Sequence, residues 1–146
     1  MRVLVTGANG FIGSAVARAL MLAGHQVLGL VRHRQRANGL ARLGVELAIG
    51  EMADPSTYLP LVDQVEGVIH LAQQRPSGRW TRKKISTMHK SDQLMARTLA
   101  HACIARDIGL IYTSGALSHC GNGASWIDEN TPWRPCQLAL GHADMV

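Results

Sequence analysis

A short apolar segment at the N-terminus runs directly into a glycine-rich turn. Residues 2–6 (RVLVT) predict a buried β-strand, and residues 7–13 (GANGFIG) follow it with glycine at every third position. Gly7 can adopt backbone angles that a side chain forbids, Gly10 lets the backbone approach a pyrophosphate, and Gly13 lets the next helix pack closely on the strand. That helix would direct its free N–H groups and positive dipole end at the anion. The turn therefore predicts a dinucleotide ligand.

The surroundings of the turn strengthen this prediction, because 15 glycines in 146 residues can produce such a spacing by chance. Apolar residues at helical spacing follow the turn, Gly24 is a helix stop signal, and residues 26–31 (QVLGLV) predict a second strand. Strand, turn, helix and strand within about thirty residues make a βαβ unit. A tight turn between strand and helix without any ligand is the alternative interpretation.

Three further apolar runs predict strands at residues 45–49 (VELAI), 67–71 (GVIHL) and 110–113 (LIYT). Strands that alternate with helical segments predict an α/β fold, a doubly wound parallel sheet of the Rossmann type with strand order 3-2-1-4-5 and helices on both faces. The order reverses between the first and fourth strands. We therefore expect the ligand to lie across the carboxyl ends of those two strands.

The connections between these strands carry their own signals. Asp54 before Pro55 predicts a helix N-cap, with the helix continuing to about residue 65. Residues 34–43 predict a basic helix or loop, and residues 73–84 a polar, basic segment outside the core. Residues 91–106 predict a long helix. Its buried stripe would consist of Leu94, Met95, Thr98, Leu99, Ala102 and Cys103.

Composition excludes several classes of protein. No apolar run approaches the length of a membrane span and the N-terminus is a strand rather than a signal sequence, so we expect a cytoplasmic protein with no membrane partner. Cys103, Cys120 and Cys136 are odd in number and lack metal-ligand spacing, so they are interpreted as reduced thiols with no metal site. The net charge of +5 suits a phosphate-bearing ligand. An aromatic content of 4% argues against nucleic acid as a partner.

Five ordered segments resemble the extended short-chain dehydrogenases, specifically the NAD-dependent epimerase/dehydratase family. The segments are TGANGFIG at 6–13, GEMADP at 50–55, VIHLA at 68–72, YTSG at 112–115 and IDENTP at 127–132. The resemblance extends over essentially the whole chain. It implies that the cofactor's pyrophosphate is bound by the turn residues Gly7, Asn9, Gly10, Phe11, Ile12 and Gly13.

The resemblance also implies which residues contact the rest of the cofactor. In the family an acidic residue closing the second strand binds the adenosine ribose, whereas this chain has Arg32 there. A guanidinium can pair with a 2′-phosphate, so NADP is favoured over NAD, and a solvated surface arginine is the alternative. Glu51 and Met52 would lie beside the adenine. The segment beneath the cofactor would be Leu71, Ala72 and Gln73, and His70 before it is interpreted as a structural histidine.

Family chemistry resembles hydride transfer assisted by a Ser or Thr hydroxyl and by a Tyr with a Lys four residues later. Ser114, or its neighbour Thr113, matches the hydroxyl, and capping of a turn is the alternative role. The Tyr–Lys pair is not found, because Val62 and Ala116 stand four residues after Tyr58 and Tyr112.

Family members resemble chains about twice as long, with a substrate lobe beyond the cofactor domain. We therefore interpret residues 1–146 as one NAD(P)-binding Rossmann domain without its C-terminal substrate lobe. The fifth strand would then be an exposed edge, which favours a homo-oligomer. The predicted function is cofactor binding within an epimerase/dehydratase-like or reductase-like oxidoreductase acting on a nucleotide-sugar or related carbonyl substrate. The alternatives are a non-catalytic module that binds or senses NADP and an inactive truncated relative.

Overall fold

The computed structural model of the chain describes residues 1–74, 78–113 and 126–132. The chain divides into two compact units. The first comprises Met1–Gln73 and Leu94–Thr113, and the second comprises Gln74–Gln93 and the residues from Ser114 onward. Helix α4 (Arg82–Ile104) therefore begins in the second unit and ends in the first. Within the described ranges, no helix is both long and apolar enough to cross a membrane.

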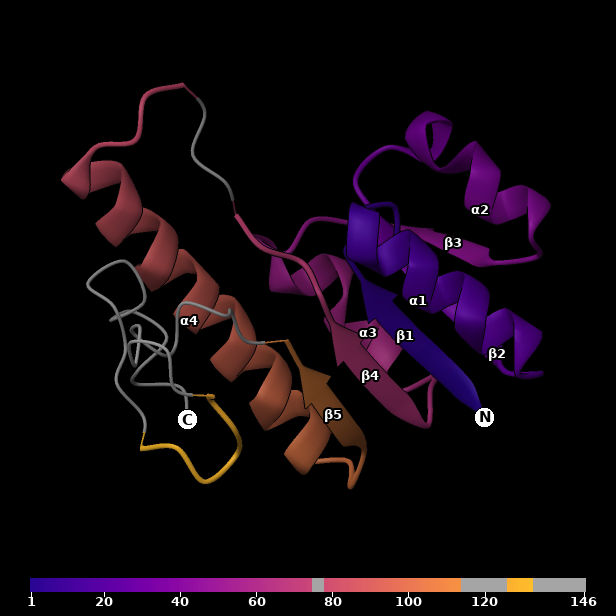
Figure 1. The fold of residues 1–146 in the computed structure, drawn as a ribbon. Helices are drawn as coiled ribbons and strands as arrows, with labels where there is room; N and C mark the ends of the chain where they lie inside the picture. Colours follow the sequence, from indigo (N-terminus) through magenta and orange to yellow (C-terminus); the bar gives the residue numbers. More distant parts are fainter. Residues whose placement is uncertain (75–77, 114–125, 133–146) are drawn as a thin grey trace. The chain divides into compact units, whose positions relative to one another are not determined.

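The first unit is built on a five-stranded sheet in which every neighbouring pair of strands is parallel (Figure 1). The strand order is β3-β2-β1-β4-β5, which confirms the predicted fold class and topology. Strand bounds agree with the sequence-based prediction to within one residue at each end. The strands are β1 (Arg2–Thr6), β2 (Gln26–Val31), β3 (Glu46–Ile49), β4 (Gly67–His70) and β5 (Gly109–Tyr112).

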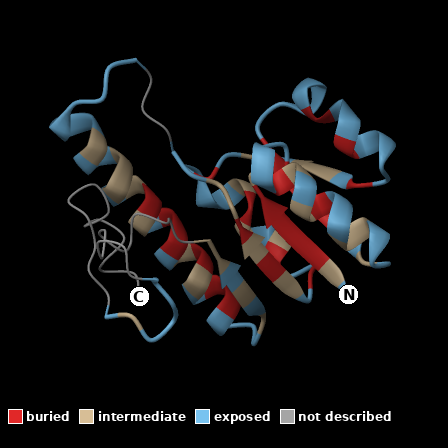
Figure 2. Ribbon diagram, in the orientation of Figure 1, coloured by how far each residue is buried: buried red, intermediate tan, exposed pale blue. Residues whose placement is uncertain are grey.

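Helices cover both faces of this sheet, and Figure 2 shows the buried residues concentrated on its central strands. Side chains alternate along β1, so Val3 and Val5 join one core cluster while Leu4 joins the other. The helices packed on the Val3 side are α1 (Phe11–Leu22), the short 3-10 helix η1 (Arg34–Ala37) and α2 (Asn38–Arg42). Those on the Leu4 side are α3 (Leu59–Val62) and the C-terminal part of α4, preceded by the 3-10 helix η2 (Pro55–Thr57).

Helices α1, α2 and α4 end in the same hydrogen-bonded motif. After α2, Gly44 adopts φ 85° and the N–H of Val45 donates to the carbonyl of Leu40 at 3.1 Å. After α1, Gly24 adopts φ 81° and the N–H of His25 donates to the carbonyl of Leu20 at 3.0 Å. The predicted stop at Gly24 therefore has a physical basis. After α4, Asp107 takes the equivalent left-handed position with φ 53°, and the N–H of Ile108 closes the motif. Aspartate is one of the few residues with a side chain that tolerate this conformation.

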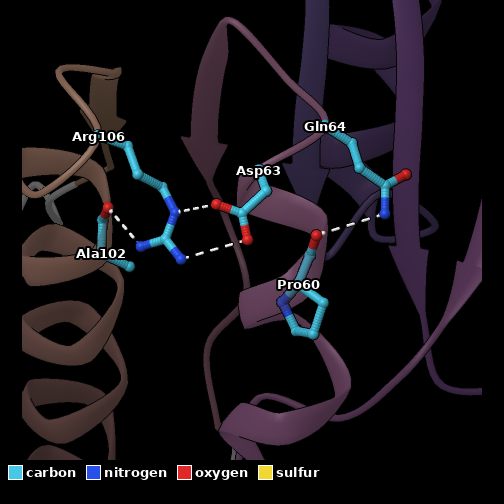
Figure 3. Close-up of polar contacts among 5 residues, drawn as sticks. All are labelled: Pro60, Asp63, Gln64, Ala102 and Arg106. Atoms are coloured by element: carbon cyan, nitrogen blue, oxygen red, sulfur yellow. Dashed lines mark hydrogen bonds and ion pairs between the residues drawn. The ribbon is translucent and has the colours of Figure 1, made fainter.

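An ion pair joins the end of α4 to the end of α3 (Figure 3). The Arg106 guanidinium donates to both carboxylate oxygens of Asp63 and also to the carbonyl of Ala102 at 3.2 Å. The hydrogen bond from Arg106 lowers the pKa of the Asp63 carboxyl. Nearby, the Gln64 side chain donates to the carbonyl of Pro60 at 3.3 Å. Because both charged groups remain partly exposed, we expect this pair to add little to the stability of the fold.

Two predicted helices differ from those observed. Helix α4 begins at Arg82 rather than near Ser91, because the Thr81 hydroxyl accepts a hydrogen bond from the N–H of Lys84 at 3.3 Å and caps the first turn. The helix expected over residues 54–65 is instead two short pieces, η2 and α3. Proline at position 60 has no N–H to continue a helical ladder through this stretch.

The cap predicted at Asp54 is confirmed, since its carboxylate accepts from the N–H of Ser56 at 3.1 Å. The edge expected at β5 is also visible in the described part of the chain, where β5 pairs with β4 alone and Ile111 is 62% exposed. Whether this edge supports self-association stays a prediction.

The predicted buried stripe of α4 is wrong at one position and correct at its centre. Leu94 is 68% exposed, whereas Leu99 is fully buried at 0%. We therefore expect Leu99→Ala to lower the free energy of unfolding by about 2–5 kcal/mol, because it leaves a cavity among residues of the core. Leu94→Ala, the matched control on the same helix, should change it by less than about 0.5 kcal/mol. Urea unfolding of both variants tests this, and equal losses would contradict the assigned burial.

Candidate functional site

The candidate site lies within the first unit, at the edge of the sheet where the parallel strands end. Strands β1 and β4 are paired with Thr6 opposite His70, so the glycine turn after β1 and the segment after β4 leave the sheet side by side. Strand β2 ends on the other side of β1, with Arg32 as the next residue. This is the position at which the strand order reverses and where open α/β sheets place their ligands.

The glycine turn is fixed by backbone packing. Gly7 adopts φ 67°, and the N–H of Gly10 donates to its carbonyl at 2.9 Å. A Cβ added at Gly7 would lie 2.9 Å from the backbone nitrogen of Ala72. A Cβ added at Gly13 would lie 2.1 Å from the Gly7 carbonyl oxygen. The turn therefore packs directly on the chain after β4 and on the start of α1, and neither contact leaves room for a side chain.

The first turn of α1 is left without a side-chain cap. Gly10 is the N-cap residue, so no side chain hydrogen-bonds to the first N–H groups, and the first turn contains no acidic residue. Phe11 is 96% exposed and Ile12 is also exposed. The N-terminus of a twelve-residue helix thus presents free donors and a positive dipole end beside the turn. This arrangement suits an anion such as a pyrophosphate.

A groove with a volume of about 580 Å³ extends from the turn between α1 and the η1–α2 segment. Asn9 lines it near the turn, and Arg18 of α1 and Arg36 of η1 supply two positive charges. Arg32 is exposed but is not one of the residues that line the groove. Arg36 and Arg18 are residues that the sequence-based reasoning did not select. The signal for Arg36 was present, because Arg32 belongs to a run of alternating arginines at 32, 34 and 36.

The two residues expected beside the adenine differ in burial. Glu51 is exposed just beyond β3, whereas Met52 is buried and belongs to the apolar core. The hydroxyl of Thr57 accepts from the N–H of Glu51 at 3.0 Å and donates within the same loop. Thr57 therefore shapes this loop, and sequence reasoning missed it because the partners are backbone atoms.

The segment predicted to run beneath the cofactor is held by the last residue of β1. The Thr6 hydroxyl accepts from the N–H groups of Leu71 and Ala72, both at 3.2 Å, and lies 2.6 Å from Nδ1 of His70. His70 is 2% exposed, and its burial lowers its pKa from 6.5 to about 4. A neutral, hydrogen-bonded histidine agrees with the structural role expected for it. Gln73, the last predicted residue of the segment, is exposed.

The candidate catalytic hydroxyls follow β5. Thr113 is half-buried, and its N–H donates to the carbonyl of His70 at 3.3 Å, so it lies at the same edge as the glycine turn. Ser114 lies outside the described residues. Tyr58 is fully buried in the core and Tyr112 packs against the His70 ring with 5.6 Å between centroids. Over the described ranges, no cluster of His, Cys, Asp or Glu could hold a metal ion.

The close packing of the turn predicts that adding one methyl group at Gly13 strongly destabilises the fold. Gly13→Ala places its Cβ against backbone atoms that have no flexible end to move, so we expect the free energy of unfolding to fall by about 3 kcal/mol or more. Gly39→Ala in α2 is the matched control, because nothing lies within 4 Å of a Cβ there. Alanine favours a helix over glycine, so this variant should gain up to about 1 kcal/mol. Similar unfolding midpoints for the two variants would contradict the packing.

The low pKa of His70 predicts a pH dependence of stability. Between pH 6.5 and about 4, the unfolded chain binds a proton at His70 that the folded chain excludes. The contribution of His70 to the free energy of unfolding is therefore complete above pH 6.5. As the pH falls from 6.5 to about 4, this contribution decreases by about 1.4 kcal/mol per pH unit. Denaturant unfolding across the window should show this slope, and His70→Asn should reduce it while His101→Asn, at an exposed histidine, should not. An unchanged slope in His70→Asn would contradict the assignment.

Comparison with known proteins agrees with this architecture. The model of the NAD dependent epimerase/dehydratase family matches residues 3–138. The 2-alkyl-3-oxoalkanoate reductase of Stenotrophomonas maltophilia is 36% identical over 115 residues, which are 78% of this chain and 33% of the reductase. An uncharacterised protein of Saccharomyces cerevisiae is 37% identical over 153 residues, covering 99% of this chain and 50% of that protein. This chain thus spans between a third and a half of the length of these relatives.

Solved structures reproduce the fold. The UDP-glucose 4-epimerase of Bifidobacterium longum, solved with NAD⁺ and UDP, superposes with a TM-score of 0.81 over 99% of this chain and 46% of the epimerase, at 20% identity. At that identity the likeness concerns the fold alone. The family match spans most of the sequence and falls on the parallel sheet and glycine turn described above, and on this basis the chain belongs to the NAD-dependent epimerase/dehydratase family, with its NAD(P)-binding, oxidoreductase-like fold.

Proposed function

We propose that this chain binds NADP at the carboxyl edge of its sheet and serves as the cofactor-binding part of an oxidoreductase or epimerase that acts on a carbonyl or nucleotide-sugar substrate. The observation that carries the proposal is the uncapped N-terminus of α1, directly behind a glycine turn that packs on the chain after β4. The proposed contacts to the pyrophosphate come from the turn and helix start. These residues are Gly7, Asn9, Gly10, Phe11, Ile12 and Gly13.

The choice of NADP over NAD is supported by the charges beyond the turn. An acidic residue at the end of β2 would repel a 2′-phosphate, and this chain has Arg32 there. Arg36 and Arg18 add positive charge along the adjoining groove, in which Asn9 also lies. Guanidinium groups bind phosphate with two parallel hydrogen bonds. The proposed adenine contacts are the exposed Glu51 and the loop above the buried Met52.

The proposed chemistry places a carbonyl near Thr113 and Ser114. The nicotinamide of a bound cofactor supplies or accepts a hydride. Leu71, Ala72 and Gln73 are proposed to support that end of the cofactor, and the Thr113 hydroxyl, or that of Ser114, to hydrogen-bond the substrate oxygen. The reductase relative, whose name denotes a 3-oxoalkanoate substrate, supports carbonyl reduction as the reaction type.

A second candidate function is a module that binds or senses NADP without turnover. Tyr58 is fully buried in the core, so it is not placed to act as an acid or base at the sheet edge. Tyr112 packs against His70 and is followed four residues later by Ala116 rather than by lysine. These observations favour the binding function over catalysis for residues 1–146.

Calorimetric titration of the 146-residue chain with NADPH and NADH tests the proposal. We expect NADPH to bind more tightly, and Arg32→Ala to weaken NADPH by about tenfold or more while leaving NADH unchanged, because a charge-assisted contact to phosphate is lost. Arg36→Ala should also weaken NADPH binding. Arg42→Ala, at an exposed arginine of α2 that does not line the groove, is the matched control and should bind both cofactors as before.

A folded chain that binds neither dinucleotide would overturn the proposed function. If NADPH and NADH bind with equal affinity, and Arg32→Ala and Arg36→Ala leave both affinities unchanged, only the proposed preference for NADP is overturned. Oxidation of NADPH in the presence of 3-oxoalkanoates or nucleotide-sugars then separates the two candidates. Turnover that falls in Thr113→Val supports the enzyme, and binding without turnover on any substrate of this panel supports the sensing module.

A further inference from the structure

Three polar side chains form a row across the otherwise apolar face of the sheet that α3 and α4 cover. Thr6 on β1, His70 on β4 and Tyr112 on β5 occupy matching positions in the strand register, and each is the last residue of its strand. Thr6 is 0% exposed and His70 is 2% exposed. Leu4, Val68 and Leu110 precede them along the same strands on this face and contribute to the apolar core. Buried polar groups are costly unless they are satisfied, so the row calls for a physical explanation.

The hydrogen bonds of Thr6 use the full capacity of its hydroxyl. A hydroxyl has two lone pairs and one proton. The N–H of Ala72 donates to Oγ1 at 3.2 Å, and the N–H of Leu71 is shared between Oγ1 at 3.2 Å and the Thr6 carbonyl oxygen at 3.3 Å, so both lone pairs of the hydroxyl face a donor. The hydroxyl proton is left to point at the remaining neighbour, Nδ1 of His70, at 2.6 Å. Nδ1 of His70 must therefore accept, and the ring carries its proton on Nε2.

Because Nδ1 of His70 accepts, His70 fixes the orientation of the Thr6 hydroxyl. If Nδ1 carried a proton, it would compete with Leu71 and Ala72 for the lone pairs of Thr6. The N–H of Leu71 would keep the Thr6 carbonyl as a second acceptor at 3.3 Å, whereas the N–H of Ala72 would lose its bond to Oγ1. Burial, which lowers the pKa of His70 to about 4, keeps the ring in the neutral form that can accept.

The segment held in this way is the one against which the glycine turn packs. A Cβ at Gly7 would lie 2.9 Å from the nitrogen of Ala72 and 3.1 Å from the carbonyl carbon of Leu71. Any shift of the chain after β4 would therefore displace the turn or open a gap beside it. His70 also accepts, through its own carbonyl, the N–H of Thr113 at 3.3 Å.

We infer that the Thr6–His70 hydrogen bond is a positioning device for the dinucleotide site: it orients the Thr6 hydroxyl so that Leu71 and Ala72 are held against the glycine turn. The inference rests on the proposed function, since it concerns the affinity of the same site. Thr6 and His70 are positioning residues, and neither need touch the ligand. Removal of this bond should weaken dinucleotide binding beyond what the loss of stability alone would cause.

Paired substitutions separate the roles of the two side chains. Thr6→Val keeps the shape of the side chain and removes the hydroxyl, whereas Thr6→Ser keeps the hydroxyl. His70→Leu removes the acceptor, whereas the amide oxygen of His70→Asn can replace Nδ1. Leu99→Ala is the control for stability, because Leu99 lies in the core and makes no hydrogen bond at the sheet edge. Each variant is titrated with NADPH at a temperature at which thermal melts show it fully folded.

We expect Thr6→Val and His70→Leu to weaken NADPH binding by about tenfold or more, and Thr6→Ser and His70→Asn to restore affinity to within about threefold of the unsubstituted chain. Leu99→Ala should lower the melting temperature without changing the affinity of the folded fraction. Nitrogen NMR of the His70 ring should show the proton on Nε2.

Unchanged affinity in Thr6→Val and His70→Leu would overturn the inference while leaving the proposed function intact. A proton on Nδ1 would overturn it as well. Absence of NADPH binding by the unsubstituted, folded chain would instead overturn the proposed function together with this inference.

Discussion

The hydroxyl of Thr6 joins the two strands between which the sheet reverses its order. It bonds to two backbone N–H groups after β4 and to His70 within β4, and so ties the end of β1 to a segment about 65 residues away in the chain. Parallel strands give a sheet regular hydrogen bonds only along their length, and beyond the last paired residue the chains are free to diverge. Thr6 extends the contact past that point. The glycine turn and the chain on which it packs meet at this junction.

Much of the fold could be predicted because its signals are local. Strands buried on both faces appear as continuous apolar runs, and glycine spacing marks a turn where a side chain cannot fit. Gly24 and Asp54 show the same principle, because each acts on backbone atoms within a few residues of itself. The strand order followed from the alternation of strands with helices and from the constraint on the hand of each crossover.

Features that depend on distant partners could not be predicted. Nothing near His70 in the sequence identifies Thr6 as its hydrogen-bond partner, since the two meet only when β1 and β4 pair. The start of α4 was missed because residues 82–90 are basic and polar, and a single hydroxyl at Thr81 decides where the helix begins. Leu94 fits a helical period as well as its neighbours do, but only the placement of the sheet determines which side of α4 is covered. The charged groove beside α1 is likewise a product of packing between two helices.

The tightness of the glycine turn has a further consequence for how a ligand is recognised. A loop that must fold around its ligand loses conformational entropy on association, and this loss weakens binding. Here the backbone of Gly7 and Gly13 is already in contact with its neighbours at both ends, so the turn is preorganised and has little freedom left to lose. Such a turn cannot adapt its shape to different ligands. In the proposed site, discrimination between related ligands would therefore fall to side chains outside the turn such as Arg32, whose substitution would leave the backbone of the turn in place.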